Sequence, residues 1–76
     1  MNKEELLKEI GERIRVIRNQ KGLTQKQLAH LIGKDQQSIH RLETGNINPS
    51  FIYLYEIAQG LEVSLQEIVN INSLQA

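Results

Sequence analysis

The chain has 76 residues, with nine basic side chains balanced by nine acidic ones, and it contains no cysteine. A domain this small therefore has neither disulfides nor thiolate metal ligands to stabilise it, and packing of its elements must suffice. No apolar run approaches the ~20 residues that cross a bilayer. The charged residues 1–15 also lack the apolar stretch of a signal peptide, so we expect a cytoplasmic protein without membrane contact.

The charges are unevenly distributed along the chain. Residues 13–45 carry seven lysine and arginine side chains against two carboxylates, whereas residues 1–12 carry two against four and residues 46–76 carry none against three. The net charge of zero therefore hides a basic middle between acidic ends, which suits one surface that faces phosphates. Because the excess is modest, affinity from this source should fall quickly as the salt concentration rises.

The first predicted helix begins after Asn2, which with Glu5 has the spacing of a capping box, and ends at Gly22. Four apolar residues recur within it at steps of three or four, as one helix face requires. These residues are Leu7, Ile10, Ile14 and Ile17.

Two shorter helices separated by a glycine are predicted next. Thr24 and Gln27 form another capping box, and the helix that they open stops at Gly33. Asp35 can cap the following helix, which ends at Gly45. A helix, a glycine turn and a second helix in direct succession predict a helix-turn-helix.

The fourth and fifth predicted helices follow Pro49. Ser50 caps the fourth, and its inward positions are Leu54, Ile57, Ala58 and Leu61. Ser64 and Glu67 form a third capping box, which opens a short fifth helix. No segment alternates with the period of a strand, so we expect a compact all-α domain over residues 1–70. The tail, residues 71–76, lacks a cap or periodic pattern, and we expect it to fray or to join a partner.

The third predicted helix has two chemically different faces. Ile39 and Leu42 form its apolar face. The opposite face carries long polar side chains, which are Gln36, Gln37, His40 and Arg41. Amide and guanidinium groups of this length match the base edges in a DNA major groove. The alternative is an ordinary solvated helix face, which is what exposed glutamines usually form.

The pattern GLTQxxLA, a glycine turn, xxSIxxxExG and NPS resembles the helix-turn-helix domain of lambdoid-phage repressors and Cro proteins, the XRE family. The resemblance covers roughly residues 10–69. It implies a five-helix phage-repressor-like fold and a sequence-specific transcriptional regulator, which we expect to be a repressor. The protein would be a homodimer that places residues 36–44 in the major groove of double-stranded DNA, and bound copies would lie on the nucleoid.

The resemblance also assigns roles to individual side chains. Gln25 is expected to hold a DNA phosphate and to brace the reading helix. Gln36 and Gln37 resemble the paired glutamines with which some phage repressors read adenine and its neighbour, and Ser38 takes the place of a short side chain near backbone or base. Arg41 departs from those repressors, which carry another glutamine there. Arg41 can contact guanine or a phosphate instead, so the resemblance implies no operator sequence.

Other predicted contacts lie around this face. We expect phosphate contacts from Lys34, His40, Asn46 and Asn48, with plain solubility as the alternative reading. The resemblance further implies a structural ion pair between Arg18 and Glu43, which joins the first helix to the third. A partly buried carboxylate needs such a partner, and an always-charged arginine fits better than a lysine.

Five apolar or aromatic side chains fall outside the predicted inward positions, and these are Leu31, Ile47, Ile52, Tyr53 and Tyr55. They either pack at the domain edge or form a dimer or partner surface. The second reading motivates an alternative function, an antitoxin-type interaction module that binds a partner protein and autoregulates its operon. For self-association we expect the turn at 61–63, the fifth helix and the tail. The chain lacks a nucleophile–base pair, a metal-ligand cluster and a glycine-rich phosphate loop, so we expect no enzyme, metal or cofactor.

Overall fold

The computed structural model describes residues 2–75, and it is helical in all its regular elements. The elements in chain order are α1 (Lys3–Gln20), α2 (Gln25–Leu31), α3 (Gln36–Glu43), α4 (Phe51–Leu61), α5 (Leu65–Ile68) and the 3-10 turn η1 (Asn72–Leu74). No strand occurs among the described residues, so the predicted all-α class and the five predicted helices are confirmed. None of these helices is both long and apolar enough to cross a membrane.

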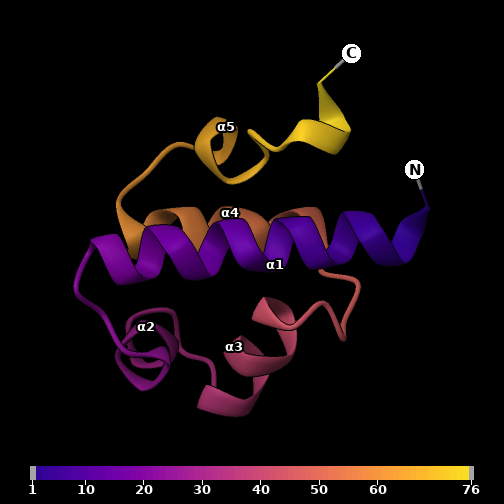
Figure 1. Cartoon of the computed structure of the whole chain (residues 1–76). Coiled ribbons are helices and arrows are strands. Elements are labelled where there is room, and N and C mark those ends of the chain that lie inside the picture. The colour runs from indigo at the N-terminus through magenta and orange to yellow at the C-terminus, as the bar shows by residue number, and fades with distance from the viewer. Residues whose placement is uncertain (1, 76) are drawn as a thin grey trace.

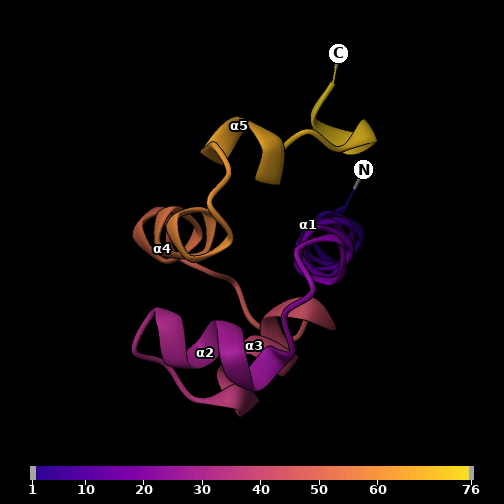
Figure 2. The same cartoon turned by 90° about the vertical axis from the view of Figure 1, so that its left-hand side faces the viewer.

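The helices form three layers. Figure 2 shows α1 and α4 nearly end-on and side by side in the middle layer. The helices α2 and α3 lie on one side of this layer, and α5 with the C-terminal turn lies on the other (Figure 1). The helix-turn-helix therefore occupies one face of the molecule, opposite α5.

A side-chain cap starts each α-helix where the sequence predicts one. Each cap accepts a hydrogen bond from the backbone N–H three residues later, and the five caps are Asn2, Thr24, Asp35, Ser50 and Ser64. Among the described residues, only Thr24 forms a complete capping box, because its own N–H donates to Gln27 Oε1 at 2.9 Å. In the box predicted at α1, the Glu5 carboxylate instead accepts from the side-chain amide of Asn2. The Asn2 cap alone is thus enough to start a helix that core packing also stabilises.

The core draws apolar side chains from all five α-helices and from the segment after α5. Its buried members are Ile10, Ile14, Ile17, Leu28, Ala29, Ile39, Leu42, Ile57, Ala58, Leu61, Ile68 and Ile71. These include all the predicted inward positions of α1 and α4 except Leu7 and Leu54, which are half-buried. Leu54 still packs against the core.

The segment after α5 is held against α1. Ile71 is 8% exposed and belongs to the core. The backbone N–H of Ser73 donates to Glu9 Oε2 at 3.2 Å, and its hydroxyl donates to the other carboxylate oxygen. The expectation that the tail frays is therefore wrong for residues 71–73, because one isoleucine and one carboxylate anchor it. Ala76 lies outside the described residues.

A glycine in the middle of α1 allows close contact with α3. A Cβ atom on Gly11 would lie 2.4 Å from the carbonyl oxygen of Leu42 and 2.5 Å from that of Glu43. Both distances are well below contact, so only glycine fits between the two backbones. Glycine inside a helix costs roughly 0.5–1 kcal/mol relative to alanine. Here it lets the last turn of α3 rest directly on α1.

Candidate nucleic-acid interface

The turn between α2 and α3 sets where the candidate reading helix begins. Gly33 has a φ of +69°, in the left-handed region that favours glycine. The N–H of Lys34 then donates back to the Ala29 carbonyl at 2.9 Å, which closes the end of α2. Asp35 accepts from the Ser38 N–H at 2.7 Å and starts α3. The turn is therefore fixed by a glycine and a cap that are both evident in the sequence.

The polar face of α3 is free of side-chain hydrogen bonds to the described residues at three of its four predicted positions. Ile39 and Leu42 are buried, whereas the polar residues Gln36, Gln37, His40 and Arg41 are all exposed. The side chains of Gln36, Gln37 and Arg41 form no hydrogen bond or ion pair with the described residues. Their donors and acceptors are available to a ligand. The structure thus gathers the predicted base-reading side chains on one solvent-facing surface.

A buried network fixes the C-terminal end of α3. Arg18 donates from Nε to Glu43 Oε2 at 2.6 Å and from Nη2 to Oε1 at 3.0 Å. The Arg18 side chain is 10% exposed and that of Glu43 is 2% exposed. A third arginine nitrogen donates to the Leu23 carbonyl at 2.7 Å, just before α2. The predicted contact is present, and its two-pronged geometry explains why arginine occupies this position.

Gln25, the first residue of α2, joins this network. Its Nε2 donates to Glu43 Oε1 at 3.1 Å and lies 3.5 Å from Nδ1 of His40. The predicted bracing of α3 by Gln25 therefore has a geometric basis in its bond to Glu43. Every buried side-chain nitrogen and oxygen among the described residues has a hydrogen-bond partner. The Glu43 carboxylate therefore accepts hydrogen bonds from both Arg18 and Gln25.

Ser38 faces α4 more than it faces solvent. Its hydroxyl lies 2.7 Å from the hydroxyl of Tyr53 and is half-buried. Burial raises the pKa of Tyr53; its bond to Ser38 opposes this, and the nearby Asp35 and Glu56 carboxylates add to the rise. The sequence placed Ser38 near DNA and left Tyr53 without a partner. The two residues lie fifteen positions apart in the sequence, so no local pattern predicts their contact.

Lys34, a predicted phosphate contact, also touches α4. Its Nζ lies 3.8 Å from Glu56 Oε1 and 5.4 Å from the centre of the Tyr53 ring. Asn46 and Asn48, the other predicted phosphate contacts, are exposed in the loop after α3. The side-chain amide of Asn46 donates to Thr44 Oγ1 at 2.9 Å. In sequence, Lys34 thus precedes α3 and the two loop asparagines follow it.

The apolar side chains that the sequence left unplaced divide into two groups. Ile47 and Tyr53 are partly buried and pack against the core, which agrees with the reading that such side chains pack at the domain edge. Leu31, Ile52 and Tyr55 are exposed, at 59%, 64% and 49%. Phe51, which the sequence reading overlooked, is 66% exposed. Its position outside the inward spacing of α4 was the signal that could have identified it.

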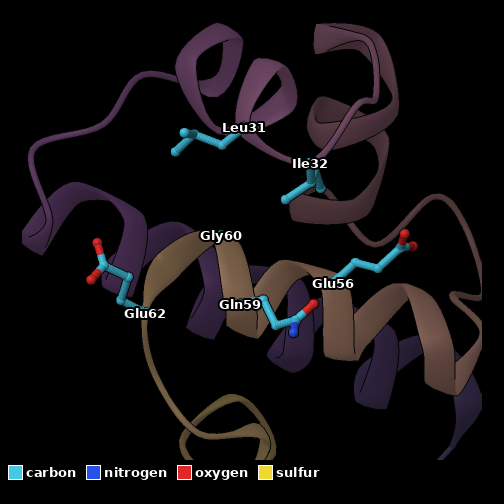
Figure 3. Close-up of a pocket in the computed structure, with 6 residues that line it drawn as sticks. All are labelled: Leu31, Ile32, Glu56, Gln59, Gly60 and Glu62. Carbon is cyan, nitrogen blue, oxygen red and sulfur yellow. The ribbon is translucent and has the colours of Figure 1, made fainter.

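Leu31 borders an open groove of about 410 Å³ between the end of α2 and α4. Figure 3 shows Glu56 and Glu62 at opposite ends of this groove, with Gln59 between them. Among residues 2–75, no three histidine, cysteine, aspartate or glutamate side chains gather closely enough to hold a metal ion. The exposed face of α3 is the surface on which the predicted base-contacting side chains gather.

Two helices joined by a glycine turn, with the second anchored from below and polar on its outer face, define a helix-turn-helix protein. A family model described as Helix-turn-helix matches residues 14–68. The chain belongs to this family, of the XRE type, as its motif indicates.

Known relatives extend this match over nearly the whole chain. An uncharacterized HTH-type transcriptional regulator, y4dJ of Sinorhizobium fredii, is 42% identical over 65 residues, which cover 86% of this chain and 84% of the relative. The crystal structure of the restriction-modification controller protein C.AhdI from Aeromonas hydrophila superimposes with a TM-score of 0.78 at 34% identity, covering 84% of this chain and 96% of that one. The clp gene regulator ClgR from C. glutamicum gives 0.81 at 25% identity, over 84% and 83% of the two chains.

Proposed function

We propose that this chain is a sequence-specific DNA-binding transcriptional regulator that inserts α3 into the major groove, with repression as the expected effect. Membership of the helix-turn-helix family and relatives named as transcriptional regulators support DNA-binding regulation. The observation that carries the proposal is the exposed polar face of α3 above a buried anchor. An anchored helix with free polar groups can present them to base edges at little entropic cost.

Each side chain of the interface has a distinct role in this proposal. Gln36, Gln37 and Arg41 contact base edges, because their amide and guanidinium groups are free and long enough to reach them. The residues that would contact phosphate are Gln25, Lys34, His40, Asn46 and Asn48. Ser38 acts near the DNA backbone through a hydroxyl that Tyr53 orients. Arg18 and Glu43 hold α3 in place and do not touch DNA.

We further propose that the protein binds a near-palindromic operator as a homodimer. Two copies would place their α3 helices in successive major grooves, with half-sites about 34–36 Å apart. The face opposite α3 is the one left free for self-association, and it carries the turn at 61–63, α5 and the segment from 71 (Figure 1). A stable interface buries more than ~1,000 Å² in total. A chain of 76 residues can supply only a modest interface of this kind, so we expect weak dimers that DNA strengthens.

Selection of bound oligonucleotides from a random pool tests this proposal. We expect enrichment of one near-palindromic sequence, with half-sites one helical turn apart. Binding isotherms on the enriched site and on random DNA then give the specificity ratio at each salt concentration. If no sequence is enriched at any salt concentration, α3 does not read bases and the proposed function is wrong.

The exposed apolar side chains of α4 favour a second candidate, the antitoxin-type module that binds a partner protein and represses its own operon. Phe51, Ile52 and Tyr55 lie within two turns of one helix, where exposed apolar groups are a cost unless something covers them. Co-purification with the product of a neighbouring gene would support this candidate. Enrichment of an operator without any such partner would leave the simple regulator.

A further inference from the structure

Lys34, a cation of the candidate DNA-binding surface, forms an ion pair with Glu56 of α4. The Lys34 ammonium lies 3.8 Å from the Glu56 carboxylate, and the two side chains are 38% and 37% exposed. Neither group is buried enough to be isolated from water or from a ligand. At 3.8 Å the two charges are in contact without a close hydrogen bond. The pair is therefore weak and open to exchange.

The pair joins the turn before α3 to α4. Tyr53 bonds to Ser38 on α3 and its ring lies under the Lys34 ammonium. Glu56 follows Tyr53 on α4 by three residues, which places both side chains on the same side of that helix. Tyr53 and Glu56 of α4 are thus both placed beside Lys34, which lies in the turn before α3.

We propose that Glu56 limits the affinity of this protein for DNA by competing with phosphate for Lys34. The inference rests on the proposed function, in which Lys34 contacts the DNA backbone. When DNA binds, the lysine exchanges one anion for another, so the gain from the phosphate contact is reduced by the loss of the Glu56 contact. The freed carboxylate also lies close to the polyanion. Both effects weaken binding without regard to base sequence.

The variant Glu56→Gln tests this competition, because it removes the charge and keeps the shape of the side chain. We expect it to bind the selected operator and random DNA more tightly by the same factor, about two- to fivefold at low salt, the range set by a surface ion pair. The specificity ratio should not change. Because salt screens exposed pairs, the gain should shrink as the salt concentration rises.

Glu12→Gln is the matched control for the loss of one negative charge from an exposed ion pair. Glu12 pairs with Arg15 on α1, and neither residue belongs to the proposed DNA-binding or self-association surfaces. Its removal should change DNA affinity clearly less than that of Glu56. In a Lys34→Gln background, Glu56→Gln should have no more effect than Glu12→Gln. Thermal melts of all variants verify that each is folded at the assay temperature.

Three results would overturn the competition. If Glu56→Gln binds both DNAs with wild-type affinity, while the wild type discriminates its operator from random DNA, the competition is refuted and the proposed function stands. An equal gain with and without Lys34 would show a general charge effect instead. A wild-type chain that binds no DNA would remove the proposed function, and the competition with it.

Discussion

The two ends of α3 are held in different ways. At its C-terminal end, Glu43 is buried in a two-pronged bond with Arg18, and the backbone rests on Gly11. Near its N-terminal end, Ser38 and the neighbouring Lys34 make half-exposed contacts to α4. Buried contacts of the first kind are costly to break, whereas exposed contacts exchange readily with water or ligand. The difference indicates that the C-terminal end fixes the orientation of α3, whereas the N-terminal end adjusts the affinity of the protein for DNA.

The largest effect should come from breaking the buried end at Glu43. Glu43→Ala leaves the Arg18 guanidinium buried without its carboxylate, and we expect a loss of about 3–5 kcal/mol in the free energy of unfolding. Urea denaturation measures this loss. The control is Glu12→Ala, which breaks the exposed pair that Glu12 forms with Arg15 within α1. This variant should leave stability unchanged within error. If the two variants are equally stable, the pair with Arg18 does not anchor α3.

A second way to disturb the buried end is to separate α1 from α3. Gly11→Ala inserts a methyl group where two carbonyl oxygens lie at 2.4 and 2.5 Å, so one helix must shift. We expect a loss of about 1–3 kcal/mol despite the better helix propensity of alanine. Operator affinity should fall as well, because α3 moves with the contact. Gly22, which has no atom within 4 Å of its added Cβ, is not a suitable control because its φ is +73°.

A suitable control for Gly11→Ala is a helix position on α1 that faces solvent. Gln20→Ala changes an exposed position whose side chain forms no hydrogen bond with the described residues, and it should not destabilise the chain by a comparable amount. If Gly11→Ala were as stable as the wild type in the same denaturation experiment, the close approach of the two helices would not be required.

The exposed face of α3 should affect discrimination and leave stability unchanged. Gln36→Ala should lose about 1–3 kcal/mol of binding energy on the selected operator and much less on random DNA, because base-edge contacts carry the discrimination. Lys34→Ala is the contrasting variant. It should weaken both DNAs alike and lower the salt slope by about one unit. Equal losses on both DNAs for Gln36→Ala would mean that this face does not read bases.

The helices and the anchored end of α3 were predictable from the sequence, but the adjustable end was not. Caps such as Thr24 and Asp35 act within three residues, so local spacing reveals them. The Arg18–Glu43 contact spans 25 residues, and it was predicted only because the family motif supplies that long-range information. Local spacing alone would have shown two unrelated charges.

The missed features all depend on contacts between distant segments that no motif records. Ser38 and Tyr53 meet only once α3 packs on α4, and Ser73 reaches Glu9 across 64 positions. Gly11 was missed for a different reason. A lone glycine in a helix can be interpreted in several ways, and only its contact with the α3 backbone shows which one applies. Packing, and not propensity, decides these positions.

The smallest effect should come from the exposed end, at the Tyr53 hydroxyl. Tyr53→Phe removes the bond to Ser38 and keeps the ring, so we expect a loss of about 0.5–1.5 kcal/mol in stability. Tyr55→Phe removes a hydroxyl from the same helix whose hydrogen bond within the described part of the chain is the exposed one with Gln59, and it should cost clearly less.

The pH dependence of stability gives Tyr53 a second signature. Burial raises its pKa, so the folded chain keeps the proton to a higher pH than the unfolded chain does. This contribution is fully present below the ordinary tyrosine pKa of about 10 and is lost as the pH rises through the folded value. The wild type should therefore lose stability above that pH more steeply than Tyr53→Phe. Parallel curves for the two proteins would show that burial does not raise the pKa of the Tyr53 hydroxyl.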